Sequence, residues 1–230
     1  MGGSQSRPTL LKEDENLDFT FVIWDFNGTI FDDVQIGMDS LNVLLERRGL
    51  PIVRDRDAYK AGFMFPIIEG YKRLGFDFNK ESYDDVAEEW VNEYRSREDT
   101  AGLADGVKEA LEHFKSLGMK QIIISASEIG MLRCQLDKLG ISSYFEEIVG
   151  VDNIHGSGKK EIALRWRKNH PSDKLLFIGD TDHDHQVATA MGAECVLVSA
   201  GHQSFERLSQ LAPKFAVLES SRELVDLIKC

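Results

Sequence analysis

Two kinds of apolar segment alternate along the chain and predict its secondary structure. Short runs such as Phe19–Trp24 and Leu175–Ile178 are typical of buried strands, whereas Val34, Met38 and Leu41 repeat at helical spacing. The expected strands are 19–24, 120–125, 146–149, 175–178, 195–198 and 215–218, and the expected helices are 33–48, 66–74, 81–97, 105–117, 129–139, 159–168, 182–191, 203–211 and 221–228. Strands that alternate with helices in this order predict an α/β fold, in which helices cover both faces of a doubly wound parallel sheet.

One stretch interrupts this alternation. Residues 33–104 are rich in helical patterns, whereas a whole βαβ unit takes only about 30 residues. We therefore expect 33–104 to form an inserted helical domain. The α/β core then comprises residues 19–32 and 105–230, preceded by a flexible leader at 1–18. Asp105 is the expected N-cap of the helix that resumes the core.

Composition narrows the possible partners. The chain has 27 Lys and Arg against 39 Asp and Glu, a net charge of −12, so its surface repels a phosphate backbone and nucleic-acid binding is not expected. No apolar run approaches the length that spans a bilayer, so we expect no transmembrane segment. The three cysteines lie far apart, which argues against a disulfide framework or a zinc site and fits a cytoplasmic protein.

The first six residues allow one exception to that localisation. The sequence Met1–Ser6 fits the pattern for N-myristoylation of Gly2. The alternative interpretation is a polar leader or a cloning remnant. A single acyl chain gives only weak membrane association, and no polybasic cluster follows it.

Polar groups follow the expected strands at the edge where an open parallel sheet binds its ligands. They are Asp25, Ser125, Lys159, Asp180 and Asp184. Clustered carboxylates repel one another unless a cation neutralises them, and oxygen ligands suit Mg²⁺. A Ser hydroxyl and a Lys ammonium can hold phosphate oxygens, and an Asp can act as the nucleophile. The set therefore indicates phosphoryl chemistry.

These residues carry a family resemblance. The segment Asp25–Thr29 resembles the first motif (DxDGT) of the haloacid dehalogenase superfamily, Ser125 the second, Lys159 the third, and Gly179–Asp184 the fourth (GDxxxD). The helical insert resembles the C1 cap of phosphoglycolate phosphatase-like members. The resemblance implies a Rossmann-like core with a cap, and Mg²⁺-dependent hydrolysis of a small phosphorylated metabolite through an aspartyl-phosphate.

The resemblance also assigns roles to single residues. The catalytic residues would be Asp25 as nucleophile, Asn27, Ser125 and Lys159. The metal would be held by Asp25, the backbone carbonyl of Asn27, Asp180 and Asp184. The expected substrate-binding residues in the core are Gly28, Thr29, Ser125, Ala126 and Lys159. Apart from the resemblance, the stretch 59–66 of the insert mixes aromatic residues with Gly and Pro, so we expect either a specificity loop, with Lys60 or Arg56 holding an anionic group, or packing within the insert. Lys160 is the alternative to its neighbour Lys159, since the two are adjacent.

Asn27 departs from the family pattern. Phosphatases of the superfamily have an Asp there, which protonates the leaving oxygen and later activates water, and Asn can do neither. Three explanations stay open: a leaving group that needs no acid, as in acyl or aryl phosphates; a substitute residue; or a slow, catalytically silent member that binds a phosphorylated metabolite. The candidate substitutes are Asp32, Asp33, His183 and His185. An engineered exchange of Asp for Asn is a fourth.

Overall fold

The structure is a computed structural model, and it describes residues 19–211, 213 and 216–227. The expected leader at 1–18, with the acylation signal at Gly2, lies outside the described residues. None of the described helices combines the length and the apolar character needed to cross a bilayer.

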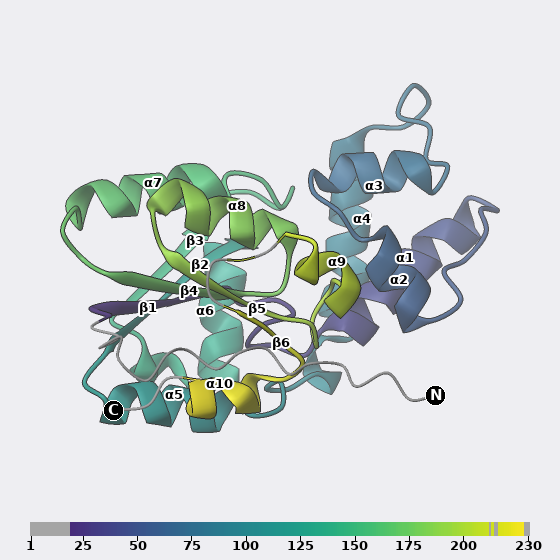
Figure 1. Cartoon of the computed structure of the whole chain (residues 1–230). Coiled ribbons are helices and arrows are strands. Elements are labelled where there is room, and N and C mark those ends of the chain that lie inside the picture. Colours follow the sequence, from purple (N-terminus) through teal and green to yellow (C-terminus); the bar gives the residue numbers. More distant parts are fainter. Residues whose placement is uncertain (1–18, 212, 214–215, 228–230) are drawn as a thin grey trace, which may run out of the picture.

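Six parallel strands form one sheet in the order β3-β2-β1-β4-β5-β6 (Figure 1). The strands are β1 (Phe21–Trp24), β2 (Lys120–Glu128), β3 (Glu147–Val151), β4 (Leu175–Gly179), β5 (Glu194–Val198) and β6 (Ala216–Leu218). The chain runs outward from β1 in one direction and then from β4 in the other. This arrangement confirms the doubly wound α/β fold and leaves a crevice where the order reverses, beside the carboxyl ends of β1 and β4.

Helices cover both faces of the sheet, because its strands are apolar on both sides. On one face, Val22 and Trp24 of β1 pack against α5 (Val107–Ser116), α6 (Ile129–Lys138) and α10 (Leu224–Leu227). On the other, Phe21 and Ile23 pack with residues of α7 (Lys159–Asn169), α8 (Asp182–Met191) and α9 (Phe205–Ser209). The short 3-10 helices η2 (Ser142–Tyr144) and η3 (Ser221–Glu223) complete the core.

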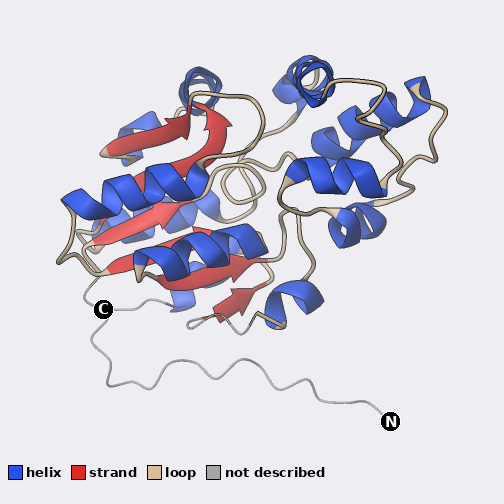
Figure 2. Cartoon of the chain, turned by 90° about the horizontal axis from the view of Figure 1, so that it is seen from above, coloured by secondary structure: helices blue, strands red, loops and turns tan. Residues whose placement is uncertain are grey.

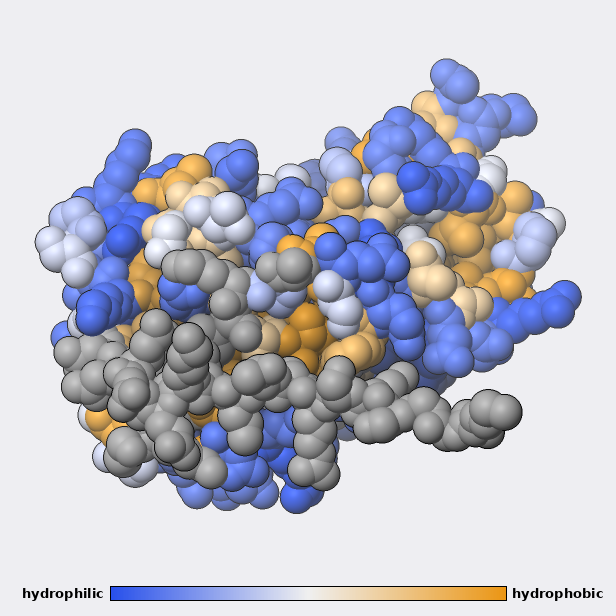
Figure 3. Space-filling view, in the orientation of Figure 1, coloured by the Kyte–Doolittle hydropathy of each residue, from blue (hydrophilic) through white to orange (hydrophobic). Residues whose placement is uncertain are grey.

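The insert consists of α1 (Val34–Arg47), α2 (Arg56–Gly62), α3 (Ile67–Arg73), α4 (Tyr83–Arg95) and the 3-10 helix η1 (Glu98–Thr100). The four helices α1 to α4 share a separate apolar cluster that includes Leu44, Tyr71 and Val86. They lie to one side of the sheet (Figure 2). Hydrophilic residues cover much of the face seen in Figure 3, in keeping with the charge of the chain. The domain boundaries at 33 and 104 stay predictions.

Two local features differ from expectation. Helix α2 has no amphipathic pattern, since Tyr59 is its one buried residue, and it begins because Asp55 accepts a hydrogen bond from the Ala58 backbone N–H. The expected capping of α5 by Asp105 is wrong: Gly106 is the N-cap, and Asp105 forms a two-pronged ion pair with Arg222. A Cβ at Gly106 would lie 2.4 Å from the Arg222 backbone nitrogen, so this close approach excludes a larger residue.

Candidate active site

The carboxyl ends of the strands bring the predicted polar residues together. Asp25 follows β1, Ser125 lies in β2, Asp180 follows β4, and Lys159 and Asp184 stand in the first turns of α7 and α8. All five are buried, the most exposed being Asp25 at 7%. Asp25, Asp180 and Asp184 each offer a carboxylate oxygen within 4.8 Å of the others. Charged groups buried this closely need partners, because burial removes the water that would otherwise stabilise them.

Lys159 supplies part of that compensation. Its Nζ donates to Asp25 Oδ1 at 2.6 Å and also to Asp184 Oδ1. Burial lowers the pKa of the Lys159 ammonium, but the two carboxylates outweigh burial and leave that pKa raised. The adjacent Lys160 is exposed. The geometry therefore favours Lys159 over Lys160 as the lysine that contacts the cluster.

The pKa values of the three carboxylates shift in different directions. Burial raises the pKa of Asp25 to about 6, with Lys159 opposing and Asp184 adding to the rise. Burial also raises the pKa of Asp180 well above its usual range, against the opposing charge of His202. Burial acts on Asp184 in the same direction, but Lys159 outweighs it and the pKa of Asp184 is lowered. One ammonium is thus too little charge for three carboxylates, and oxygen donors arranged this way fit a divalent cation such as Mg²⁺.

The turn after β1 fixes the position of Asp180. Gly28 adopts a φ of +73°, and a Cβ there would lie 2.2 Å from Asp180 Oδ2, so a side chain would strain the turn and collide with the carboxylate. The Thr29 hydroxyl donates to Asp180 Oδ1 at 3.1 Å, and the His202 backbone N–H donates to Oδ2 at 2.6 Å. Gly28 and Thr29, expected to bind substrate, thus contact Asp180.

Asn27 is held in a network that joins the core to the insert. Its side-chain amide donates to Asp33 Oδ2 at 2.7 Å and to the Tyr94 hydroxyl at 3.0 Å, and its carbonyl oxygen accepts from the Ser127 hydroxyl. The Tyr94 hydroxyl also donates to Asp33 Oδ2, at 2.7 Å. Sequence reasoning missed Tyr94 and Ser127. No sequence pattern links Tyr94 to the site, because it is remote from the other site residues along the chain. Ser127 could have been predicted, since alternate residues of a strand share a face and Ser127 lies two positions after Ser125.

His202 completes this network as the cation that balances Asp33. Its Nε2 lies 3.2 Å from Asp33 Oδ1, and its Nδ1 lies 3.3 Å from the hydroxyl of Tyr59 in α2. Burial lowers the pKa of His202, but Asp33 outweighs burial and raises that pKa to about 9. Burial correspondingly raises the pKa of Asp33, but His202 outweighs it and the net shift is downward. The network therefore holds an imidazolium–carboxylate pair beside Asn27.

A cavity of about 230 Å³ extends from the carboxylates into the insert. It is lined by Asp25, Asn27, Ser125, Ala126, Lys159, Asp180 and Asp184, and by side chains of α1 to α4. Of the candidate substitutes for an acid at position 27, Asp33 and His183 line this cavity, whereas Asp32 and His185 are not part of its lining.

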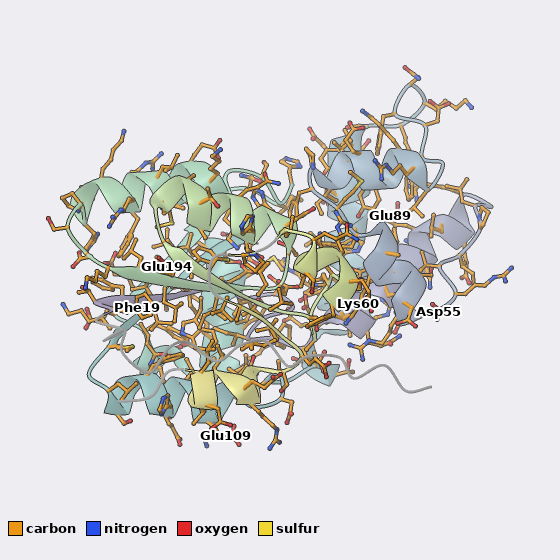
Figure 4. All side chains as sticks on the ribbon, in the orientation of Figure 1. Phe19, Asp55, Lys60, Glu89, Glu109 and Glu194 are labelled. Carbon is orange, nitrogen blue, oxygen red and sulfur yellow. The ribbon has the colours of Figure 1, made fainter. Side chains whose placement is uncertain are left out.

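Lys60 lies at the boundary between the insert and the core (Figure 4). Its Nζ donates to the backbone carbonyls of Ser199 at 2.9 Å and Ala200 at 3.1 Å, and the residue is not part of the cavity lining. The contacts join α2 to the loop after β5. The expected role of Lys60 in substrate binding stays a prediction, and in this structure the ammonium connects insert and core.

Known proteins resemble the chain over most of its length. A family model described as haloacid dehalogenase-like hydrolase matches residues 22–198. A phosphoglycolate phosphatase from Pseudomonas syringae pv. syringae is 23% identical over 214 residues, covering 89% of this chain and 78% of the relative. A haloacid dehalogenase-like hydrolase from Streptococcus pneumoniae superposes with a TM-score of 0.72 at 20% identity, covering 92% of this chain and 99% of that one. A predicted phosphatase from Clostridium acetobutylicum superposes with a TM-score of 0.71 at 20% identity, covering 90% of this chain and 97% of that one.

Proposed function

The chain belongs to the haloacid dehalogenase-like hydrolase family, and we propose that it hydrolyses small phosphate monoesters with Mg²⁺ through an aspartyl-phosphate on Asp25. The observation that carries the proposal is the contact of Lys159 with both Asp25 and Asp184, inside a buried carboxylate cluster at the sheet edge. A lysine placed there can neutralise a nucleophilic carboxylate and a phosphoryl group together. The named relatives include phosphatases, which agrees with this chemistry.

The reaction divides into two displacements at phosphorus. First, a carboxylate oxygen of Asp25 forms a bond to phosphorus, and the ester P–O bond breaks with its electron pair going to the leaving oxygen. Then water attacks the phosphorus of the aspartyl-phosphate, and the bond from phosphorus to the Asp25 oxygen breaks with its electron pair returning to the carboxylate, which releases inorganic phosphate. The proton that the water loses balances the proton that the leaving oxygen takes up. Ser125 lines the same cavity and could donate a hydrogen bond to a phosphoryl oxygen.

The donor set fits Mg²⁺. Asp25, Asp180, Asp184 and the backbone carbonyl of Asn27 would hold the ion. Burial, with a smaller contribution from neighbouring carboxylates, raises the pKa values of Asp25 and Asp180, and a cation would favour their ionised forms. A bound Mg²⁺ would supply positive charge for the phosphoryl oxygens. Lys159 would keep its contact with Asp25, so the nucleophile stays ionised and oriented.

Asn27 supports a second candidate, a member of the family that binds a phosphorylated metabolite with little turnover. The amide donates to Asp33 and Tyr94 and carries no acidic proton, so it cannot protonate a leaving oxygen or activate water. General acid–base catalysis is worth about 10² to 10⁴ in rate. A phosphatase without it would act slowly on alkyl esters.

The test is phosphate release from acyl, aryl and alkyl phosphates, with Mg²⁺ and with a chelator. Asp25→Ala is the inactive variant. Asp32→Asn is its matched control, because Asp32 is an exposed carboxylate on the same loop and lies outside the cavity lining, away from where an acid would act. Mg²⁺-dependent release that disappears in Asp25→Ala and persists in Asp32→Asn supports the phosphatase. Binding of a phosphate ester without release supports the second candidate.

A further inference from the structure

The part of the cavity formed by the insert is apolar and rich in aromatic rings. Phe63, Phe65, Tyr71, Tyr83, Trp90 and Tyr94 all line it. Two of these rings stack on histidines of the core. The ring centroids of Phe63 and His202 are 4.6 Å apart, and those of Phe65 and His183 are 4.7 Å apart. Because His183 immediately precedes Asp184, this aromatic wall adjoins the carboxylate cluster.

The cavity offers almost no positive charge for a second anionic group. Among the described residues, Lys159 is the one Lys or Arg in its lining, and it already contacts Asp25 and Asp184. The His183 ring is stacked against the Phe65 ring. His202 is balanced by Asp33.

Two cations of the insert have partners outside the cavity. Lys60 donates to the carbonyls of Ser199 and Ala200, and Arg48 pairs with Glu81 and Glu89. Among the described residues, a carboxylate on the leaving group would therefore lose its hydration without gaining a Lys or Arg as a partner, and the one further histidine of the lining is His155.

On the basis of the phosphatase activity proposed above, we propose that the preferred substrate is a phosphate ester of an uncharged aromatic alcohol or phenol, whose ring occupies this cavity. An apolar cavity of about 150 Å³ is enough to bind benzene, and the whole cavity here, including its carboxylate end, measures about 230 Å³. Aromatic rings packed on one another in offset or edge-to-face arrangements gain stability beyond the area they bury. The same cavity disfavours phosphoglycolate, whose leaving group carries a carboxylate.

Asn27 gives an independent reason for an aromatic leaving group. A phenol has a pKa of about 10, well below that of an alkyl alcohol, so a phenolate can leave with less help from an acid. The apolar lining and the amide at position 27 thus favour the same class of substrate. Phenyl phosphate combines both features, and 2-phenylethyl phosphate retains only the aromatic ring.

Binding of inert analogues tests the cavity without relying on turnover. The full chain with Mg²⁺ is titrated calorimetrically with benzylphosphonate and with phosphonoacetate. The two ligands share the phosphonate group, but benzylphosphonate carries a phenyl ring where phosphonoacetate carries a carboxylate. We expect benzylphosphonate to bind about tenfold or more tightly, since each tenfold in affinity needs only about 1.4 kcal/mol. Equal affinities, or tighter binding of phosphonoacetate, would overturn the inference.

A variant pair tests whether the insert sets this preference. Met64 lines the cavity from a partly exposed loop position, so its replacement is compatible with folding. Met64→Lys should shift the affinity ratio toward phosphonoacetate by about tenfold, as expected for a new charge partner, while Met64→Leu keeps the wild-type ratio. An unchanged ratio in Met64→Lys counts against the assignment.

Turnover separates this inference from the proposed function. Tighter binding of benzylphosphonate without phosphate release from any ester would support the preference of the cavity for an aromatic ring and refute the phosphatase. Faster release from phosphoglycolate than from 2-phenylethyl phosphate would support the phosphatase and refute the inference, because both are alkyl esters and one carries a carboxylate where the other carries a ring.

Discussion

The side-chain amide of Asn27 donates a hydrogen bond of 2.7 Å to the buried carboxylate of Asp33. Asp33 also accepts from the Gly28 backbone N–H at 2.7 Å and from the Tyr94 hydroxyl, and it pairs with His202. A carboxylate at position 27 would face this carboxylate directly. An amide, which donates, is the residue type that fits the position as long as Asp33 is ionised.

Exchanging the amide at position 27 with the carboxylate at position 33 should therefore keep the fold stable, whereas a carboxylate at both positions should destabilise it. In Asn27→Asp, two adjacent carboxyls would share a proton, and we expect lower stability. In the double variant Asn27→Asp/Asp33→Asn, one amide and one carboxylate remain, so we expect stability to recover. The carboxylate would then stand where it can act as acid and base. Release of phosphate from alkyl esters should rise by about 10² or more, measured by steady-state kinetics.

Asp33→Asn alone is the control for this exchange, because it removes the carboxylate without restoring one at position 27. It should lower stability and leave the rate on alkyl esters unimproved. A double variant that folds but turns over no faster than the wild type would show that the missing acid at 27 does not limit the reaction.

Lys159→Met should abolish activity and destabilise the fold, whereas Lys160→Met should do neither. Lys159 is 2% exposed and contacts two carboxylates, so its removal leaves buried charges without a partner, at a cost of about 3 to 5 kcal/mol. Lys160 is exposed. Urea unfolding and phosphate release measured on both variants check the assignment. Equal losses in the two would contradict it.

Mg²⁺ should raise the thermal unfolding temperature of the wild-type protein, and a chelator should reverse the rise. Saturation at about 100 times the dissociation constant stabilises a protein by about 2.7 kcal/mol. Asp180→Asn should remove the effect, because Asp180 belongs to the carboxylate cluster, while Asp32→Asn should keep it. A Mg²⁺-induced shift that survives in Asp180→Asn would place the ion elsewhere.

The His202–Asp33 pair should make stability depend on pH in a defined window. Since burial opposes but Asp33 raises the pKa of His202 from 6.5 to about 9, the folded state binds the proton more tightly. The pair's contribution is fully present below pH about 6.5 and is lost as pH rises through about 9, for a total of about 3 kcal/mol.

Unfolding in chelator as a function of pH measures this loss without a metal contribution. His202→Gln should flatten the profile between these two pH values, and His185→Gln, a change at a partly exposed histidine outside the cavity lining, should not. A wild-type profile that is already flat in this window would exclude the ion pair.

The hydrophobic pattern was sufficient to predict the order of strands and helices, because buried parallel strands are short continuous apolar runs, whereas amphipathic helices repeat their apolar residues every three to four positions. It also placed Asp25, Ser125 and Asp180 at one edge, since the carboxyl ends of parallel strands meet there. The cap of α5 was wrong because the contact of Asp105 with Arg222, remote in sequence, competes with local capping. Helix α2 was not predicted, because it buries a single residue and so shows no helical repeat of apolar positions.

The sequence by itself determined the fold class and the carboxylates and lysine of the candidate site, because strand order and local spacing encode them. The absence of an acid at position 27 was visible through the resemblance of Asp25–Thr29 to the family motif. Only the tertiary structure decided which residues surround Asn27, and that Lys159 contacts the carboxylates while Lys160 faces solvent. Asp33, Tyr94 and His202 come from three separate segments, and their contacts depend on how the insert packs on the core. The apolar lining of the cavity depends on the same packing, because no local pattern fixes which faces of α1 to α4 enclose it.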